Sequence, residues 1–291
     1  MPDPRQLVYF NGRIVPVDEA RLPLDDRGVL YGLGFFETFR TSGGRPHHWS
    51  YHQRRLAAAC AVARLALPPM GLARNEARLR ETVTALLRAH SFVDAVFRYT
   101  VTGGAGGVPS EFLTLRPLPA EPPAEGIRLR VLQLARDSGE WLPRPKSLNY
   151  ANALLGADEL AARSTGPGDE GLFLARDGGC VVETPRQNLA WIAGGRLCYP
   201  DPALGAIAGT CLAWLLTHGG QPAEPRRASL GDLLSAEAVL VLNAVRGLTP
   251  VREIWDAGDR GVLRSFASAH HPVVQDFRSR WAGALRVTAA A

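Results

Sequence analysis

The chain has one lysine, Lys146, and 32 arginines among its 33 basic residues. Lysine is normally one of the commonest residues, and an arginine-rich genome explains the many arginines better than it explains the one lysine that is kept. Arginine can supply a surface charge, but it holds its proton and cannot attack a carbonyl or carry protons as an amine does. Lys146 is therefore a candidate Schiff-base lysine, and a lone surface lysine is the alternative.

Further candidate groups are a carboxylate, an arginine and two anion-binding loops. Glu183 ends a β-prone run, where a buried carboxylate would need a charged or proton-sharing partner; a surface hairpin glutamate is the alternative. The small residues of 205–211 open a predicted helix, and free N–H groups at a helix start bind anions such as phosphate. Segment 243–251 predicts a second anion-binding loop, and Arg55, on a predicted helix, could reach a phosphate. A tightly packed helix entry and an exposed helical arginine are the alternatives.

The composition fits a globular protein and argues against a nucleic-acid-binding one. With 291 residues, 46% hydrophobic and 21% charged, the chain fits a globular protein of one large or two medium domains. The net charge of +5 and the pI near 9.3 suggest nucleic acid, but the arginines are spread out and alternate with acidic residues. An arginine-biased surface and an anionic small substrate explain this charge better, so we expect no nucleic-acid partner.

The chain lacks sequence signals for a membrane, a secretory leader or a metal. No apolar run approaches the roughly 18 residues of a membrane helix, and the N-terminus shows no signal peptide, which predicts a soluble cytoplasmic protein. No cysteine pair has metal-binding spacing, so we expect reduced thiols and no metal site. The four scattered cysteines are Cys60, Cys180, Cys198 and Cys211.

The secondary-structure signals predict an α+β fold. A proline-rich stretch, 117–126, cannot be a helix or a central strand and marks a boundary between a domain at 1–116 and one at 127–291. For the first domain we predict strands at 7–10, 13–17, 95–102 and 111–115, a segment at 29–40 that runs through two glycines into β-rich sequence, a hairpin turn at 41–45, and helices at 50–64, with Ser50 as N-cap, and 74–90. For the second we predict strands at 127–134 and 238–243, hairpins at 171–184 and 188–199, and helices at 149–163, 205–216 and 266–286.

Together, the order and spacing of these segments resemble the fold-type IV pyridoxal-phosphate enzymes. That family includes branched-chain aminotransferase, D-amino acid aminotransferase and 4-amino-4-deoxychorismate lyase. The resemblance runs from Asn11 to Val251. Its segments are Asn11-Gly12, Asp26 to Gly28, Tyr31 to Arg40, His52 to Leu56, Lys146 to Tyr150, Asp177-Gly178, Val182 to Thr184, Asn188 to Trp191, Gly205 to Cys211 and Asn243 to Val251.

The resemblance implies a fold, a cofactor and a role for each candidate residue. It implies two domains, an N-terminal α/β sandwich and a C-terminal domain with a β-barrel-like sheet, in a homodimer. Lys146 would hold pyridoxal 5′-phosphate as a Schiff base and move the substrate's Cα proton, while Glu183 would keep the pyridine nitrogen protonated. Arg55 would bind the phosphate, helped by the N–H groups at the helix start. The implied cofactor-binding residues are Lys146, Glu183, Arg55, Tyr150, Asn188, Thr210, Cys211 and Ala244, and the implied substrate-binding residues are Tyr31, Phe36, Thr38, Arg40 and Arg98.

Three positions bear on a lyase assignment. Ala244 stands where the related transaminases usually offer a hydroxyl, and the lyase resembles the chain there. Phe36 replaces the tyrosine of the carboxylate-binding site in D-amino acid aminotransferase. Gly103 removes an arginine expected in both that enzyme and the lyase, so it counts against both, and Ala244 is the position that favours the lyase. The resemblance thus favours a lyase that forms 4-aminobenzoate and pyruvate, a reaction of folate biosynthesis.

The alternative is a transaminase of branched-chain or D-amino acids. Arg98, Tyr31 and Arg40 resemble branched-chain aminotransferase, although Thr38 stands where that enzyme usually has glycine. Leu33 replaces an aspartate that many family members carry. Either enzyme would act on a small anionic amino carboxylate. A ligand-binding homologue without activity is disfavoured because the candidate lysine and glutamate are both present.

Overall fold

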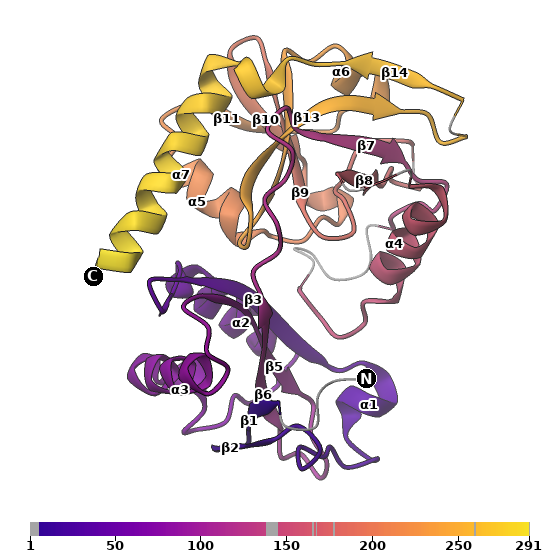
Figure 1. Cartoon of the computed structure of the whole chain (residues 1–291). Coiled ribbons are helices and arrows are strands. Elements are labelled where there is room, and N and C mark those ends of the chain that lie inside the picture. Colours follow the sequence, from indigo (N-terminus) through magenta and orange to yellow (C-terminus); the bar gives the residue numbers. More distant parts are fainter. Residues whose placement is uncertain are drawn as a thin grey trace. The chain divides into compact units, whose positions relative to one another are not determined.

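The computed structural model describes residues 6–137, 145–164, 166, 168–176, 178–258 and 260–290, and contacts divide it into two compact units (Figure 1). The first unit contains Met1–Pro119, Pro145–Asn149 and Gly283–Ala291, and the second contains Ala120–Arg144 and Tyr150–Ala282. The division after Pro119 falls inside the proline-rich stretch. The segment with Lys146 and the end of the last helix group with the first unit, although the sequence placed both within 127–291.

The first unit is built on a six-stranded antiparallel sheet in the order β2-β1-β6-β5-β3-β4. Its strands are β1 (Leu7–Phe10), β2 (Arg13–Pro16), β3 (Gly34–Ser42), β4 (Arg45–Pro46), β5 (Ala95–Thr102) and β6 (Glu111–Pro117). Its helices are α1 (Arg27–Tyr31), α2 (Trp49–Val62), the 3-10 turn η1 (Leu72–Arg74) and α3 (Glu76–Ala89). The predicted hairpins and both long helices of this region are confirmed.

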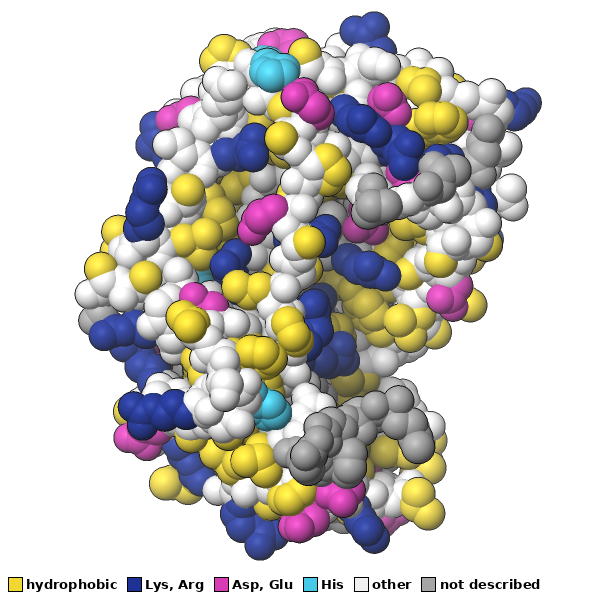
Figure 2. All heavy atoms as spheres, in the orientation of Figure 1, with side chains coloured by type: hydrophobic (Ala, Val, Ile, Leu, Met, Phe, Trp, Pro, Cys, Tyr) yellow, Lys and Arg dark blue, Asp and Glu magenta, His cyan; other side chains and the backbone are white. Residues whose placement is uncertain are grey.

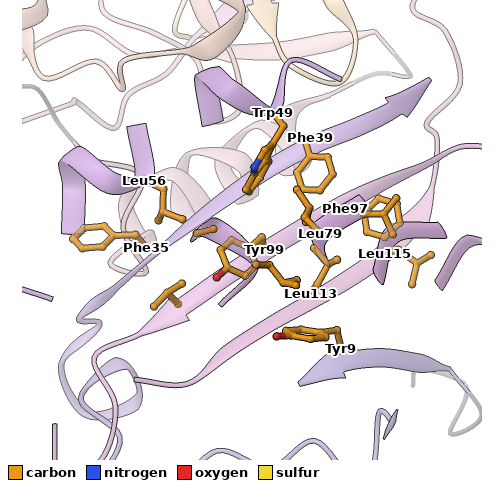
Figure 3. Close-up of a cluster of buried hydrophobic side chains, with 14 of the residues drawn as sticks. Tyr9, Phe35, Phe39, Trp49, Leu56, Leu79, Phe97, Tyr99, Leu113 and Leu115 are labelled. Carbon is orange, nitrogen blue, oxygen red and sulfur yellow. The ribbon is translucent and has the colours of Figure 1, made fainter. Parts of the chain in front are cut away.

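The core of the first unit lies between this sheet and its helices (Figure 3). Alternate residues of β3 and β5 point into it, among them Phe35, Phe39 and Phe97, because neighbouring side chains of a strand point to opposite faces. Phe39 stacks on Phe97 with ring centroids 5.6 Å apart and meets Trp49 edge-on at 5.2 Å. Each such side chain contributes roughly 1.5–3 kcal/mol by leaving water.

Two helix starts of the first unit differ from the prediction. Asp26, predicted in a turn-like break, is the N-cap of α1 and accepts a hydrogen bond from the Gly28 N–H at 2.7 Å. The N-cap of α2 is His48, with φ +52°, and not Ser50. The chain leaves β4 through this left-handed residue, so α2 begins at Trp49.

The second unit contains an eight-stranded mixed sheet in the order β11-β10-β9-β12-β13-β7-β8, with β14 paired to β13. Its strands are β7 (Ile127–Val131), β8 (Asp169–Leu172), β9 (Asn188–Ala193), β10 (Arg196–Pro200), β11 (Ala223–Arg226), β12 (Ala238–Asn243), β13 (Gly247–Trp255) and β14 (Val262–Ser265). Its helices are α4 (Ala151–Arg163), η2 (Pro202–Leu204), α5 (Thr210–His218), α6 (Leu230–Leu234), η3 (Ser268–His270) and α7 (Pro272–Ala290), whose last turns group with the first unit.

Two predicted helix starts in the second unit are corrected by the structure. Helix α5 begins at Thr210 and not at Gly205, and α7 begins at Pro272 and not at Phe266. The predicted 171–184 hairpin is confirmed in irregular form: Leu174 bridges Val181, and the Phe173 and Ala175 N–H groups donate to the Glu183 and Cys180 carbonyls, while β8 pairs in parallel with β7. The predicted turn at Asp177 lies outside the described residues.

Several expectations about composition can be compared with the described residues. No helix among them is long and apolar enough to cross a membrane, and no group of three metal-ligating side chains occurs among them. All four cysteines are free thiols, as predicted. On the face shown in Figure 2, acidic and apolar side chains lie among the basic ones.

Candidate active site

Lys146 lies beside the start of β3 in the first unit. The Phe36 N–H donates to the Lys146 carbonyl at 2.9 Å, and the Leu148 N–H donates to the Gly34 carbonyl at 2.9 Å. Gly34 must be glycine, because a Cβ there would come within 2.6 Å of the Val101 carbonyl oxygen. Segment Pro145–Asn149 thus extends the sheet edge and fixes the backbone from which the lysine projects.

Two cationic side chains share the Phe36 ring. The Lys146 Nζ is 4.6 Å from the ring centroid, and the Arg98 Cζ is 3.5 Å from it. Thr38 faces Arg98 across β3 and β5, and Phe36 is on the same face of β3. The structure therefore brings three predicted substrate residues, Phe36, Thr38 and Arg98, together with the predicted lysine.

The other two predicted substrate residues, Arg40 and Tyr31, come from other parts of the first unit. Arg40 is on the same face of β3 but farther along the strand, and its Nε donates to the Thr41 carbonyl at 3.3 Å. Tyr31 ends α1 and is 75% exposed. At Gly103 a Cβ would lie 2.9 Å from side-chain carbons of both Arg27 and Leu33, so this backbone leaves no room for the arginine expected there.

In the first unit, the buried carboxylate of Glu37 is hydrogen-bonded to Arg55 and His52. Arg55 donates to Glu37 through Nε at 2.8 Å and through a terminal nitrogen at 2.5 Å, and the His52 Nδ1 lies 2.6 Å from Glu37. Burial alone would raise the pKa of Glu37, but the Arg55 charge and the hydrogen bonds from His52 and Arg55 lower it to about 2. Glu37 is therefore a carboxylate that orients Arg55.

His52 is a neutral member of this cluster. Burial lowers the pKa of His52, the contact with Glu37 opposes that shift, and the charges of Arg55 and Lys146 add to it. Because Glu37 is the ionised acceptor, the His52 proton is assigned to Nδ1. The His52 Nε2 is buried and has no hydrogen-bond partner among the described residues.

Glu183 is the buried carboxylate of the second unit. Its Oε1 accepts from Arg136 in an ion pair whose side chains are 2% and 3% exposed. Its Oε2 accepts from the Ile207 N–H at 3.0 Å and from the Asn188 Nδ2 at 3.3 Å. The sequence alternative of a surface glutamate is excluded, and Glu183 has the charged partner that its burial requires.

The loop before α5 is shaped by Asn188. The Asn188 Nδ2 also donates to the Ile207 carbonyl at 2.8 Å, so both backbone groups of Ile207 bind the Glu183–Asn188 pair. A Cβ on Gly209 would lie 1.6 Å from the Asn188 Oδ1, which only glycine avoids. These bonds hold 205–209 out of the helix and explain why α5 starts at Thr210.

The start of α5 retains the features of an anion site. Its N-cap, Gly209, has no side-chain hydrogen bond, so the first N–H groups of the helix, including those of Thr210 and Cys211, are not capped by that residue. Nearby, the Tyr150 hydroxyl donates to the Pro185 carbonyl at 2.9 Å and holds the turn after Glu183. Thr210 and Cys211 are both buried.

The second predicted anion loop contains Ala244, and its N–H groups are partly used within the loop. The Asn243 Oδ1 accepts from the Val245 N–H at 2.9 Å and from the Arg246 N–H at 2.7 Å. The Asn243 Nδ2 donates to the Gln187 Oε1 at 3.1 Å. The turn is thus held in place by its own asparagine, and Ala244 adds no hydroxyl to it.

Comparison with known proteins decides the family. The family model described as amino-transferase class IV matches residues 34–254, more than half of the chain. The chain belongs to this family. It is therefore an enzyme of a pyridoxal-phosphate-dependent family, and the predicted two-domain fold and cofactor are confirmed.

Individual relatives include both aminotransferases and lyases. A Methanocaldococcus jannaschii protein provisionally assigned as a branched-chain-amino-acid aminotransferase is 29% identical over 260 residues, which cover 85% of this chain and 87% of that protein. The Bacillus subtilis aminodeoxychorismate lyase is 27% identical over 265 residues, 85% of this chain and 86% of that protein. The crystal structure of 4-amino-4-deoxychorismate lyase from Pseudomonas aeruginosa matches with a TM-score of 0.77 and 26% identity, and covers 95% of this chain and 98% of that one.

The residues present fit the cofactor. An amine at Lys146, a buried carboxylate at Glu183, an arginine at Arg55 and the helix start at Thr210 are the donor and acceptor types that an aldehyde, a pyridine nitrogen and a phosphate require.

Sequence reasoning missed Glu37 and Arg136. Glu37 lies in the β-rich segment that the sequence singled out, and its alternation with Phe35 and Phe39 could have indicated burial. Arg136 has no such sequence signal, because it lies outside the strands and helices. Its backbone forms only an isolated β-bridge with Ala175.

Proposed function

We propose that this chain is an aminodeoxychorismate lyase that releases pyruvate and 4-aminobenzoate. The observation that carries the choice is the 243–246 turn, where Asn243 binds two N–H groups and Ala244 offers no hydroxyl. The related transaminases usually have a hydroxyl at that position, whereas the lyase resembles this chain. The match to the Pseudomonas aeruginosa lyase over nearly its whole length supports the same choice.

In this proposal Lys146 binds the cofactor through its amine and then moves the substrate's Cα proton. When bound, pyridoxal phosphate supplies an electron sink for the charge that develops at Cα. Glu183 accepts a hydrogen bond from the pyridine nitrogen. Arg55 and the N–H groups of Thr210 and Cys211 hold the phosphate, and Glu37 keeps Arg55 in the orientation for it.

The substrate carboxylates would be bound on the sheet face beside the lysine. Arg98 is exposed and lies against Phe36, within reach of a small anionic amino carboxylate held at Lys146. Thr38 and Arg40 share that face, and Tyr31 is the remaining proposed contact. Arg98 thus binds the substrate carboxylate in place of the arginine that was expected at the position of Gly103.

A transaminase of branched-chain or D-amino acids is the second candidate. The Methanocaldococcus jannaschii relative and the position of Arg98 favour it. Both reactions need the same lysine and the same removal of the Cα proton. They diverge afterwards, because a lyase would expel a group from the substrate's Cβ, whereas a transaminase would release a 2-oxo acid and retain the amino group for transfer.

The deciding experiment incubates the purified holoprotein separately with aminodeoxychorismate and with D- and L-amino acids. The lyase proposal expects release of pyruvate and 4-aminobenzoate from aminodeoxychorismate, while amino acids leave the visible absorbance of the cofactor unchanged. Conversion to the pyridoxamine form by an amino acid, without pyruvate release from aminodeoxychorismate, would establish a transaminase instead. The reactive enantiomer would then identify its class.

We further propose a cytoplasmic homodimer that acts in folate biosynthesis. Light scattering of the purified holoprotein tests the oligomeric state. A mass of one chain at micromolar concentration would contradict the homodimer.

A further inference from the structure

Arg136 is a buried charge to which the proposed function gives no task. It pairs with the Glu183 Oε1, and its NH1 donates to the Asn152 Oδ1 at 2.7 Å. Its Cζ lies 5.0 Å from the Phe173 ring centroid, and its backbone N–H donates to the Leu174 carbonyl at 2.8 Å. These contacts hold the guanidinium against Glu183.

The hydrogen bonds of Glu183 leave one position for a further donor. A carboxylate has about four lone-pair positions. Asn188 and the Ile207 N–H bind Oε2, and Arg136 binds Oε1. The remaining position is on Oε1, the oxygen that also accepts from Arg136.

A neighbouring cation influences where a proton shared between a carboxylate and a base resides. Arginine keeps its proton, and a cation in contact with a carboxylate favours the ionised carboxylate. A proton on Oε1 would lie next to the Arg136 charge, whereas a proton on a ring nitrogen bound to Oε1 lies farther from it. Without Arg136, burial would favour neutral Glu183, which would donate to the ring nitrogen rather than accept from it.

We propose that Arg136 is a positioning residue that holds Glu183 ionised and thereby keeps the shared proton on the pyridine nitrogen of the cofactor. The inference rests on the proposed function, in which Glu183 meets that nitrogen. It assigns Arg136 an electrostatic role in the reaction in addition to its structural one.

The second unit contains a matched control for a purely structural ion pair. Arg130 pairs with Asp169 at 3.0 Å, and the two side chains are 2% and 1% exposed. Its Cζ also lies over an aromatic ring, at 4.6 Å from the Trp255 centroid. Asp169 has no assigned role toward the cofactor, so a substitution of Arg130 removes an equally buried arginine without touching Glu183.

The principal test loads the full-length protein with pyridoxal 5′-phosphate that carries ¹⁵N in the ring and records the ¹⁵N chemical shift. In Arg136→Met the signal should move toward the value of an unprotonated pyridine, because the variant loses the charge that keeps Glu183 ionised. Arg136→Lys should restore most of the wild-type shift, and Arg130→Met should leave it unchanged. If Arg136→Met is insoluble, Arg136→Gln removes the charge and keeps an N–H donor.

A second measurement needs no cofactor. It compares the melting temperatures of the full chain prepared without pyridoxal phosphate. The melting temperature of Arg136→Met should lie further below that of wild type at pH 8 than at pH 5. Removal of the arginine leaves a buried carboxylate that is tolerated better when protonated. Arg136→Met/Glu183→Gln should lose this pH dependence.

The outcomes separate this inference from the proposed function. A ring-nitrogen signal that is the same in Arg136→Met and wild type, while Glu183→Gln shifts it, would overturn the role of Arg136 and leave that of Glu183 intact. A signal unchanged by Glu183→Gln would show that Glu183 does not meet the nitrogen, and both proposals would fall. Equal shifts in Arg136→Met and Arg130→Met would identify a general packing effect and overturn the inference.

Discussion

Each of the two units contains a buried glutamate that pairs with an arginine. The pairs differ in which partner can still bind another group. Arg55 donates two hydrogen bonds to Glu37 and is 13% exposed, while Glu37 is 1% exposed. Arg136 donates to one oxygen of Glu183 and is 2% exposed. In the first unit the carboxylate orients an arginine that reaches solvent, and in the second the arginine supports a carboxylate that keeps one acceptor position.

The difference follows from the other partners of each carboxylate. Glu37 receives its third hydrogen bond from a neutral side chain, His52, and so carries a full charge toward Arg55. Glu183 receives bonds from a side-chain amide and from the Ile207 backbone, which tie it to the loop before α5. Similar ion pairs can thus serve opposite purposes.

The largest effect should come from Lys146, which belongs to neither pair. Lys146→Ala should abolish both the visible absorbance of the bound cofactor and turnover. Lys146→Arg should be equally inactive, because arginine stays protonated. Persistent turnover in either variant, measured as product release, would remove Lys146 from the reaction.

Removal of the carboxylate of the first pair should be the most damaging change to stability. Glu37→Gln leaves Arg55 without its buried anion, and we expect a loss of about 3–5 kcal/mol of unfolding free energy, measured by denaturant titration. If Glu37 matters only because it orients Arg55, the double variant Glu37→Gln/Arg55→Met should recover part of that loss. An additive result would show that the two side chains are independent.

The acid stability of the chain should report the same pair. The pKa of Glu37 is lowered from 4.5 to about 2, so its contribution is complete above the unfolded-state pKa and is lost as the pH falls toward 2. The shift corresponds to roughly 3 kcal/mol between neutral and strongly acid pH. The Glu37→Gln variant should therefore show a flatter decline in unfolding free energy below pH 4.5, and an equally steep decline would exclude Glu37 as its source.

A smaller effect should distinguish a guanidinium from an ammonium in the first pair. Arg55→Lys keeps the charge but cannot make both hydrogen bonds to Glu37, so we expect about tenfold weaker retention of pyridoxal phosphate, or about 1.4 kcal/mol. Equilibrium dialysis of the cofactor measures this. Unchanged retention would mean that Arg55 does not hold the phosphate.

The smallest effect should come from an exposed pair of the same residue types. Arg80 and Glu76 on α3 pair at 2.7 Å but are 56% and 47% exposed. Arg80→Ala should cost no more than about 0.5 kcal/mol, since solvent screens exposed i,i+4 pairs. A loss comparable to that of Glu37→Gln would remove burial as the explanation of the contrast.

Much of the fold could be predicted from local signals. Turn chemistry at Asn11-Gly12 located the β1–β2 hairpin, and alternating or β-branched runs gave β5 and β12 with their bounds. β13 was missed because Pro250 lies within it, in a strand paired on both sides, where proline is rarely tolerated. β11, α6 and β14 were missed as well; they are only four or five residues long.

The site was predictable only where a residue type carries its own chemistry. Lys146 could be singled out because it is the one lysine of the chain, whereas Glu183 gained its candidate role from the resemblance to the family. The partner of Glu183 could not be found, because Arg136 is one of 32 arginines and reaches Glu183 only through tertiary pairing. The start of α5 was misplaced for a similar reason, since the bonds from Ile207 to Glu183 and Asn188 are invisible in the sequence.

The most direct test of the central claim is where the cofactor is attached. The holoprotein should be treated with borohydride, which fixes a pyridoxal phosphate bound through an amine, and then digested and mapped by mass spectrometry. The proposal predicts a cofactor-derived mass on the peptide that contains Lys146. Label confined to the N-terminal amine, or no label on a protein that still turns over substrate, would contradict it.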